Sequence, residues 1–281
     1  MSGRFKGRKI ALLTQHGKEA VLKPALDAAL GCEVQHVTGF DTDLLGTFTR
    51  DIDRAGGQLD AVRTKARKGM ELSGLSIGVA SEGSFGPDPF TGMLTWNVEH
   101  VILIDQDRGL EVTGTAQMVA RCGELLAANW EEAAAFALAN GFPSHQMVIR
   151  SQKKNVSTLY KGIYDWTTLE TRFKEAQKTS ADGKVWMESD LRAFANPTRM
   201  ENIRRATVDL LKRLKSECPT CSMPGFWRTQ SLRGMPCRTC GAPTHLPRGE
   251  VWKCVWCAHS DTTFKPATET AEAKYCQVCN P

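Results

Sequence analysis

The stretch Cys218-Pro-Thr-Cys221 is the first of four Cys-x-x-Cys pairs that close this 281-residue chain. It is followed by Cys237-Arg-Thr-Cys240, Cys254-Val-Trp-Cys257 and Cys276-Gln-Val-Cys279, so the four pairs hold eight of the ten cysteines. Each pair can present two thiolates to one ion, and a structural Zn²⁺ needs four ligands in a tetrahedron. The spacing therefore predicts two complete four-cysteine zinc sites, in a small domain that needs the metal to fold.

The spacing leaves open which pairs share an ion. Gly241 directly follows the second pair and permits the tight turn of a zinc knuckle, while Val251 to Lys253 has the pattern of a strand leading into the third pair. These features favour a nested, zinc-ribbon-like arrangement over sequential or cross-braced pairing. In the nested arrangement Cys237/Cys240 share an ion with Cys254/Cys257, Cys218/Cys221 share one with Cys276/Cys279, and His245 and His259 are spare.

Composition predicts a globular protein without membrane spans. The chain is 41% apolar and 24% charged with a net charge of +5, and no apolar run approaches the ~20 residues that cross a bilayer. The start is basic, but the apolar run from Ile10 to Leu13 is too short for a signal-peptide core. We expect a cytoplasmic protein, in which reduced thiols bind metal rather than form disulfides.

The first 215 residues alternate strand-like and helix-like segments, which predicts an α/β domain with a mixed sheet covered by helices. A small zinc-binding domain should occupy 216–281. Expected strands are 9–14, 33–38, 75–80, 98–105, 147–151, 161–163 and 184–188, and expected helices are 18–30, 51–72, 123–140, 166–178 and 197–215.

Two polar segments near the start could bind phosphate. Thr14-Gln-His-Gly-Lys-Glu19 joins the first strand to the first helix, where backbone N–H groups with Thr14, His16 and Lys18 would receive an anion. The segment from Asp41 to Asp51 gathers three acids and an arginine beside a glycine, a composition suited to Mg²⁺ with phosphate. An ordinary turn and ordinary helix caps are the alternatives.

Two later segments add acids and arginines. Glu82 is predicted to lie just past a buried strand, in a loop with two glycines, where open α/β sheets bind ligands; Asn97 and Glu99 should lie nearby. Further along, Arg192 and Arg199 accompany acids between residues 188 and 199, which suggests an anion or metal site. A surface salt-bridge network is the alternative there.

The order of these segments resembles the inosine-triphosphatase-like superfamily, pyrophosphatases that cleave non-canonical purine nucleoside triphosphates. That resemblance spans about residues 9–115 and implies Lys18 on phosphate, with Asp51 and Glu82 on Mg²⁺ or the attacking water. The sequence departs from the pattern at His16, where the superfamily has Asn, and in the insertion at 43–46. The matching stretches are Thr14 to Lys18, Asp41-Thr42, Thr47-Phe48, Asp51, Lys65-Ala66 and Ser81-Glu82-Gly83.

The whole chain also resembles an uncharacterised bacterial family that pairs such a domain with a C-terminal Cys-pair module, and this resemblance implies no activity. It rests on three stretches, Gly46-Thr-Phe48, Ser81-Glu-Gly-Ser-Phe-Gly86 and Asn196-Pro-Thr-Arg-Met200.

The leading hypothesis is a Mg²⁺-dependent phosphohydrolase acting on a nucleotide or related phosphorylated small molecule, with two structural zinc ions. The catalytic candidates are Glu82, Asp51 and Lys18. The residues expected to contact the substrate are His16, Thr14, Arg192, Arg199 and Asn97. The alternative is a non-enzymatic zinc-ribbon adaptor that binds nucleic acid or protein. That adaptor would use the basic helix before the cysteines and the surface of Trp227, Trp252, Trp256, Arg228, Arg233, Arg238 and Arg248.

Overall fold

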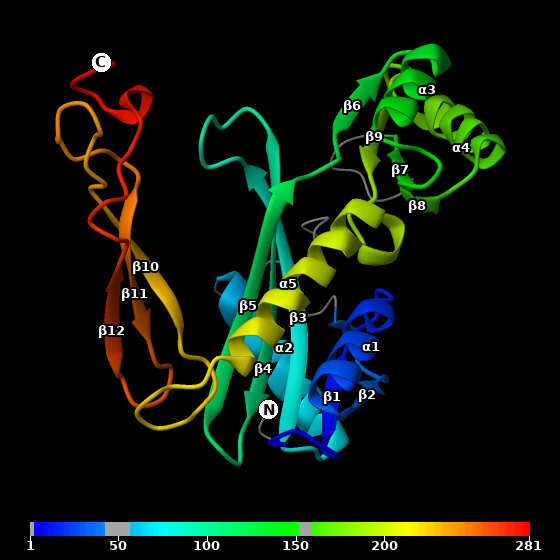
Figure 1. Ribbon diagram of the computed structural model, residues 1–281. Helices are drawn as coiled ribbons and strands as arrows, with labels where there is room; N and C mark the ends of the chain where they lie inside the picture. Colours follow the sequence, from blue (N-terminus) through cyan, green and yellow to red (C-terminus); the bar gives the residue numbers. More distant parts are fainter. Residues whose placement is uncertain (1–2, 43–56, 152–158) are drawn as a thin grey trace.

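The computed structural model describes residues 3–42, 57–151 and 159–281, which form three β-sheets and the helices that pack on them (Figure 1). The mixed α/β class expected from the sequence is confirmed. Asp51 and part of the acidic segment before it lie outside the described residues. No helix in the described ranges is both long and apolar enough to span a bilayer.

The first sheet has five strands in the order β2-β1-β3-β4-β5. The second strand in this order, β1, runs parallel to both of its neighbours, β2 and β3, whereas β3, β4 and β5 form a long antiparallel ladder. The five strands are β1 (Lys9–Leu13), β2 (Glu33–Val37), β3 (Ile77–Pro87), β4 (Thr95–Asp105) and β5 (Leu110–Val119).

Helices cover both faces of this sheet. On one face α1 (Glu19–Leu30) and α5 (Pro197–Lys215) pack over buried residues such as Val79 and Leu103, and on the other α2 (Gln58–Ser73) packs over Ala80 and Ile102 (Figure 1). Residues of β3 and β4 therefore alternate between the two faces, as the two-residue period of a strand requires.

Helix α5 lies very close to β5 because the facing strand residue is Gly114. An added Cβ at Gly114 would stand 2.2 Å from the backbone nitrogen of Leu210 and 2.4 Å from the carbonyl oxygen of Ala206. Since both neighbours are helix backbone, no side-chain rotation could make room. Gly114 thus sets the distance between this helix and the sheet.

A second, four-stranded sheet in the order β6-β9-β7-β8 has its own core with α3 (Trp130–Ala139) and α4 (Trp166–Thr179). The prediction of one helix over 123–140 is wrong in its first part, where a strand pairs with β9. Helix α3 begins only after Asn129, whose side chain accepts a hydrogen bond from the Glu132 backbone. The strands are β6 (Glu124–Ala127), β7 (Met147–Arg150), β8 (Leu159–Ile163) and β9 (Val185–Ser189).

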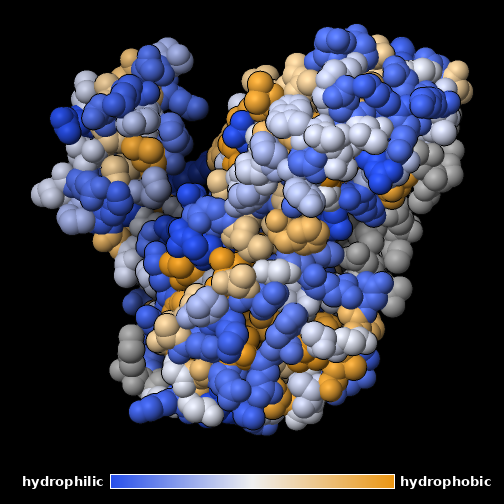
Figure 2. All heavy atoms as spheres, turned by 90° about the vertical axis from the view of Figure 1, so that its right-hand side faces the viewer, coloured by the Kyte–Doolittle hydropathy of each residue, from blue (hydrophilic) through white to orange (hydrophobic). Residues whose placement is uncertain are grey.

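The C-terminal part forms an arm along the outside of the first sheet (Figure 1). Its three antiparallel strands are β10 (Trp227–Arg233), β11 (Pro247–Lys253) and β12 (Ser260–Phe264). Single 3-10 turns, η2 (Ala193–Ala195) and η3 (Ala273–Tyr275), precede α5 and the last cysteine pair. Figure 2 shows the far end of this arm standing away from the rest of the molecule.

Two further expectations need correction. Strand β3 does not end at Ala80 but continues to Pro87, because β4 pairs with it over eleven residues from Ile77 to Pro87. Glu82 is therefore inside a strand rather than in a loop. Strand β5 was not predicted; its register with β4 from Leu110 to Val119 continues the same ladder.

Gly114→Ala should lower the free energy of unfolding by roughly 2 kcal/mol or more, because overpacking against backbone can be relieved only by moving α5. Urea unfolding with zinc retained measures the effect. Gly86→Ala is the matched control, since an added Cβ at this strand glycine meets nothing within 4 Å. Equal stability of the two variants would contradict the close packing of α5.

Candidate functional site

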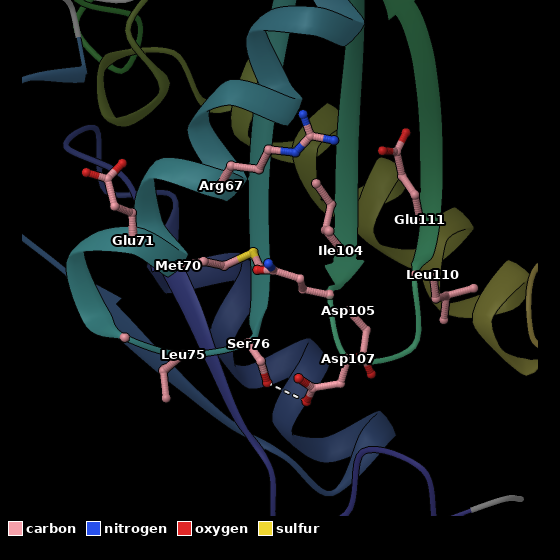
Figure 3. Close-up of a pocket in the computed structure, with 13 residues that line it drawn as sticks. Arg67, Met70, Glu71, Leu75, Ser76, Ile104, Asp105, Asp107, Leu110 and Glu111 are labelled. Carbon is pink, nitrogen blue, oxygen red and sulfur yellow. Dashed lines mark hydrogen bonds between the residues drawn. The ribbon is translucent and has the colours of Figure 1, made fainter.

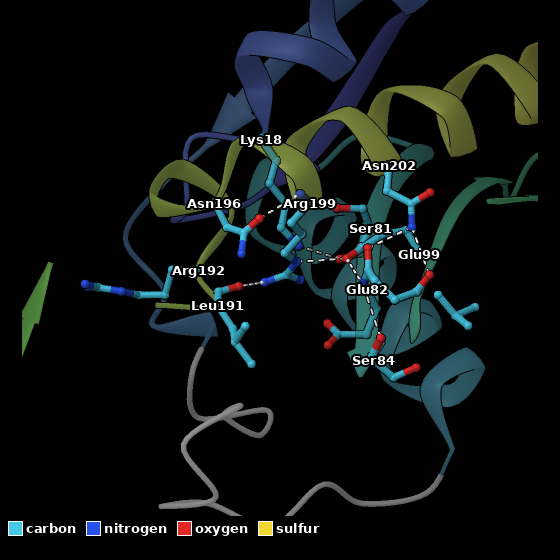
Figure 4. A network of polar contacts seen from close by, with 12 residues as sticks. Lys18, Ser81, Glu82, Ser84, Glu99, Leu191, Arg192, Asn196, Arg199 and Asn202 are labelled. Carbon is cyan, nitrogen blue, oxygen red and sulfur yellow. Dashed lines mark hydrogen bonds and ion pairs between the residues drawn. The ribbon is translucent and has the colours of Figure 1, made fainter. Parts of the chain in front are cut away.

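A group of buried polar side chains gathers at the point where β1 ends and β3 continues (Figure 4). Strand β1 ends at Leu13 and pairs with β3 only beside Gly78 and Val79, so the next backbone groups of β3 have no strand on that side. The Ser81 carbonyl oxygen accepts a hydrogen bond from Lys18 Nζ at 3.2 Å. Lys18 thereby occupies the open edge of β3.

Lys18 is the N-cap residue of α1, and its side chain is only 5% exposed. A lysine is rarely buried to this degree unless a carboxylate pairs with it. Among the residues the structure describes, no carboxylate forms an ion pair with Lys18. Within the part of the chain that the structure describes, this cation is therefore buried without a directly paired counter-charge.

Two ion pairs flank Lys18, one on each face of the sheet. On the α2 face Lys65 pairs with Glu82. On the α5 face Arg199 donates from Nε to Glu99 Oε1 at 2.8 Å, and both side chains are fully buried. The cluster consists of two neutral pairs with Lys18 between them, so its described residues carry one positive charge in excess.

Amides complete the network on the α5 face. Asn97 Nδ2 donates to Glu99 Oε1 at 3.1 Å, and Asn202 Nδ2 donates to Asn97 Oδ1 at 2.7 Å. Gly83 leaves room for the Glu99 carboxylate, because an added Cβ would stand 2.0 Å from Oε1. The network orients Glu99 from three elements, β3, β4 and α5.

Three buried oxygen atoms of this group have no hydrogen-bond partner in the described part of the chain: Ser81 Oγ, Glu99 Oε2 and Asn202 Oδ1. Buried polar groups are normally paired, so several unpaired atoms beside one unpaired charge are an unusual arrangement for a structural core. Such an arrangement is typical of a site that is completed by a ligand or by ordered water.

The pKa of Lys18 is lowered to about 7 from its usual 10.5, first because burial disfavours the charged form and then because Arg199 and Lys65 repel a further positive charge. Glu82 and Glu99 act in the opposite direction but less strongly. Near neutral pH this lysine can hold or release a proton, and a bound anion would favour its protonated form.

Of the residues predicted for the site, Lys18, Glu82, Asn97 and Arg199 belong to this cluster. Thr14 is buried, and its carbonyl oxygen accepts a hydrogen bond from His36. His16 and Arg192 both lie against Phe194 of η2: the His16 ring centroid is 6.2 Å from that of Phe194, and the Arg192 guanidinium lies 4.7 Å above it. Arg192 is also paired with Asp190.

Arg199 is buried in the protein rather than placed where it could contact a substrate. It is 1% exposed, and its guanidinium donates to Glu99 and to the Leu191 carbonyl oxygen. From there it orients Glu99 and contributes positive potential at Lys18. Asn97 is likewise buried and holds the same carboxylate.

Sequence analysis missed Asn202 and Gln58 as members of the site. Gln58 donates to the backbone carbonyls of Glu82 and Val98 at 2.8 and 2.9 Å and so fixes this part of the hairpin. A signal for Asn202 exists: Arg199 and Asn202 continue the buried face of α5 toward its N-terminus at helical spacing. Polar residues at buried helical positions mark a site more often than a core.

A hollow of about 830 Å³ opens at the other end of β3 and β4 (Figure 3). Its acids are already paired, since Asp105 bonds Arg8 and Arg108, and Glu111 bonds Arg63. Asp107 accepts a hydrogen bond from Ser76 at 2.6 Å. Arg67 also lines this hollow. In the part of the chain that the structure describes, the hollow lacks the buried ion pairs and unpaired oxygen atoms that surround Lys18, so the buried cluster is the better candidate for chemistry.

The eight cysteines of the arm form two compact groups of four thiols. Tetrahedral sulfurs about 2.3 Å from a zinc ion are separated by about 3.8 Å. The measured S···S distances, 3.7 Å for Cys218–Cys257 and for Cys221–Cys254, and 4.0 and 3.6 Å for Cys237–Cys279 and Cys240–Cys276, fit that value. The residues therefore fit two zinc ions.

The nested pairing is wrong, because the groups are cross-braced: the first pair meets the third, and the second meets the fourth. One strand separates each pair from the next, and successive strands run antiparallel, so consecutive pairs lie at opposite ends of the sheet. Alternate pairs then come together. Neither His245 nor His259 belongs to either group.

Backbone N–H groups point at sulfur in both groups, as expected for thiolate ligands. The Trp256 N–H donates to Cys254 Sγ at 3.3 Å, and the Thr239 N–H donates to Cys237 Sγ at 3.4 Å. Hydrogen bonds from the Cys240 and Thr239 backbone lower the pKa of the Cys237 thiol to about 6. A thiol that ionises readily is prepared for metal binding.

Comparison with known proteins identifies the family. The family model described as "Domain of unknown function (DUF6671)" matches residues 65–281, and because this is well over half of the chain, the protein belongs to that family. The match includes Lys65, Glu82, Glu99, Arg199 and all eight paired cysteines but begins after Lys18. No curated protein and no solved structure matches the chain.

Zinc content of cysteine variants should distinguish the two pairings. The double variant Cys218→Ser/Cys254→Ser removes two ligands of one group and should retain about one zinc per chain, whereas Cys218→Ser/Cys237→Ser should retain none. Native mass spectrometry measures the stoichiometry, with Cys32→Ser as a two-zinc control. Nested pairing would give the opposite result for Cys218→Ser/Cys254→Ser, with no zinc retained.

Lys18 should make stability depend on pH. Between pH 7 and 10.5 the unfolded chain holds a proton that folded Lys18 has released, so the free energy of unfolding rises with pH. Below pH 7 Lys18 is protonated in both states, and the full cost of burying its charge lowers the free energy of unfolding. The free energy of unfolding of Lys18→Met minus that of the unsubstituted protein should be more positive at about pH 6.5 than at about pH 9. Urea unfolding measures both.

The exposed residue Lys23 on the same helix provides the control, because its pKa is raised by a hydrogen bond with Asp27. The free energy of unfolding of Lys23→Met, relative to that of the unsubstituted protein, should not be more positive at about pH 6.5 than at about pH 9. A Lys18→Met difference that is the same at both pH values would mean that Lys18 titrates normally.

Proposed function

We propose that this protein is a Mg²⁺-dependent phosphohydrolase acting on a nucleotide or related phosphorylated small molecule, with two structural zinc ions in its C-terminal arm. The observation that carries the proposal is Lys18, a buried cation between two neutral ion pairs that forms no ion pair with a carboxylate of residues 3–42, 57–151 or 159–281. An isolated buried charge costs several kcal/mol. A bound phosphate would supply the missing negative charge.

The position of Lys18 agrees with that role. It lies at the carboxyl end of β1 and at the N-terminus of α1, where the helix dipole adds positive potential. Anions bind at helix N-termini of this kind, and open sheets bind ligands beyond the carboxyl ends of their parallel strands. Lys18 and the positive ends of the two ion pairs would stabilise charge that develops on a phosphoryl group.

The donor atoms beside Lys18 suit Mg²⁺, which prefers oxygen ligands. Glu82 provides a carboxylate on the α2 face and Glu99 provides one on the α5 face, where the buried Glu99 Oε2 and Ser81 Oγ have no partner within the described ranges. When bound there, the ion would neutralise phosphate charge and lower the pKa of a coordinated water. Lys65 and Arg199 would hold the two carboxylates in position.

The resemblance to inosine-triphosphatase-like pyrophosphatases supports the same roles, with Lys18 on phosphate and Glu82 on metal or water. It also assigns a part to Asp51, which lies outside the described residues. His16 and Arg192 both lie against Phe194 and would contact the part of the substrate beyond the phosphate.

The adaptor hypothesis receives less support from charge. Residues 216–281 carry seven Lys and Arg against five Asp and Glu. Each four-thiolate zinc centre adds a net charge of about −2, so the zinc-loaded arm would be slightly acidic. Arg228 is moreover paired with Glu250 and Lys265 with Glu269. A nucleic-acid surface would need an excess of positive charge.

Release of phosphate or pyrophosphate from a panel of nucleoside triphosphates, including inosine and xanthosine triphosphates, should require added Mg²⁺. Glu82→Gln and Lys18→Met should each lower kcat/KM about a hundred-fold or more, because they remove a carboxylate of the metal site and the charge that faces the phosphate. Mg²⁺ should be omitted rather than chelated, since chelators would also remove zinc.

Lys23→Met again serves as a control with an unchanged rate, because Lys23 Nζ bonds Asp27 and the Val34 carbonyl oxygen rather than any member of the buried cluster. Zinc content and circular dichroism should be equal for all variants. Absence of turnover by the folded, zinc-loaded protein, or a Glu82→Gln variant with full activity, would overturn the proposal.

A further inference from the structure

The first cysteine group, which joins the first and third pairs, is held by the body of the protein. Gly225 lies between Val255 of the third pair and Val112 of β5, because an added Cβ would stand 2.7 Å from the first side chain and 3.1 Å from the second. Trp256 of the same pair lies over Gly109 in the turn between β4 and β5, where an added Cβ would stand 3.0 Å from the ring. Packing of this kind keeps the third pair in place for its metal.

The second cysteine group, which joins the second and fourth pairs, stands at the free end of the arm (Figure 1). Its fourth pair belongs to the C-terminal segment 266–281, in which only Ala271 and Cys276 are buried. Among the described residues, the backbone of this segment bonds the rest of the chain only at Ala271. The Ala271 N–H donates to the Pro236 carbonyl oxygen at 2.8 Å, and the Ala271 carbonyl oxygen accepts from the Arg238 N–H at 2.9 Å. The segment therefore has no apolar core of its own.

The order of this segment should depend on the second zinc ion. Fixing each residue costs conformational entropy, which two backbone hydrogen bonds do not offset over a segment of this length. The segment is further attached by Tyr275, whose ring centroid lies 6.0 Å from that of His245, and by Cys276 and Cys279 of the second group. Metal binding supplies folding free energy in sites of this type.

The sulfur atoms of the second group are also easier to reach. Cys240 and Cys279 are both exposed, and in the described chain neither sulfur accepts a hydrogen bond from a backbone N–H. In the first group only Cys257 is exposed. Cys254 Sγ of that group accepts two backbone hydrogen bonds, at 3.3 and 3.5 Å, against one at 3.4 Å for Cys237 of the second group. Hydrogen bonds to ligand atoms raise metal affinity, so the first group should hold its ion more firmly.

We propose that the second cysteine group is a reversible zinc site, which gives up its ion to a competing ligand while the first group keeps its own. Residues 266–281 dock on the arm only while that ion is bound. The state of the C-terminal segment thus follows the availability of zinc, and the body stays folded in both states. This proposal does not depend on the phosphohydrolase activity.

Competition with EDTA, brought to equilibrium and followed by native mass spectrometry, tests the difference between the groups. With rising EDTA the unsubstituted protein should pass through a species with one zinc ion. Two double variants identify the ion that remains, because each keeps one group complete. Cys276→Ser/Cys279→Ser, with the first group complete, should hold its ion at EDTA concentrations about ten-fold or more above those that empty Cys218→Ser/Cys221→Ser.

Limited digestion with trypsin tests the docking of the segment. Cleavage after Lys274 should be about ten-fold or more faster in the one-zinc species than in the two-zinc protein, and equally fast in Cys276→Ser/Cys279→Ser. Added zinc should restore protection in the unsubstituted protein but not in that variant. Cleavage after Arg205, in the middle of α5, is the control and should stay slow throughout.

Simultaneous loss of both ions, without a one-zinc species, would overturn the proposal. A second group that holds zinc as firmly as the first, or cleavage after Lys274 at the same rate with one ion and with two, would overturn it equally. If Cys218→Ser/Cys221→Ser misfolds, the unsubstituted protein decides, because loss of its first ion must coincide with faster cleavage after Lys274.

Discussion

The close packing of α5 on β5 at Gly114 is the contact on which the other features depend. Helix backbone meets strand backbone there, with no side chain between them. Because α5 is a rigid rod of 19 residues, fixing its middle also fixes both of its ends. Its N-terminal turns bring Arg199 and Asn202 to the buried cluster, and its C-terminal end delivers the chain to the first cysteine pair.

The buried cluster follows from an early strand ending. Strand β1 stops while β3 continues, so part of β3 has a free edge inside the molecule. Lys18 fills this edge, and neutral ion pairs on the two faces support it. Such an arrangement costs stability in the empty protein, and proteins generally retain costly buried charges where they serve binding or catalysis.

The arm has two metal groups in different settings. The group with Cys218 is fixed to the body, since Met223 packs on the first core and Gly225 bonds the end of α5. The other group lies at the free end, beyond a sheet of three short strands (Figure 1). Zinc at the first group would stabilise the attachment of the arm, and zinc at the second would stabilise its tip.

The sequence by itself determined what local patterns can encode. Apolar periodicity predicted most strands and helices, the Asn196-Pro197 start predicted the N-terminus of α5, and four Cys-x-x-Cys pairs predicted two four-cysteine groups. The sequence also drew attention to Glu82, Lys18 and Asn97, whose roles stay predictions, although the continuation of β3 past Ala80 was missed.

Only the tertiary structure decided which groups meet across the chain. Cross-bracing depends on strand direction, and the pairing of Arg199 with Glu99 joins residues a hundred positions apart. The unbalanced charge of Lys18 depends on which carboxylates are already paired with other cations. Distances, burial and charge balance of this kind arise from packing, and one-dimensional spacing does not contain them.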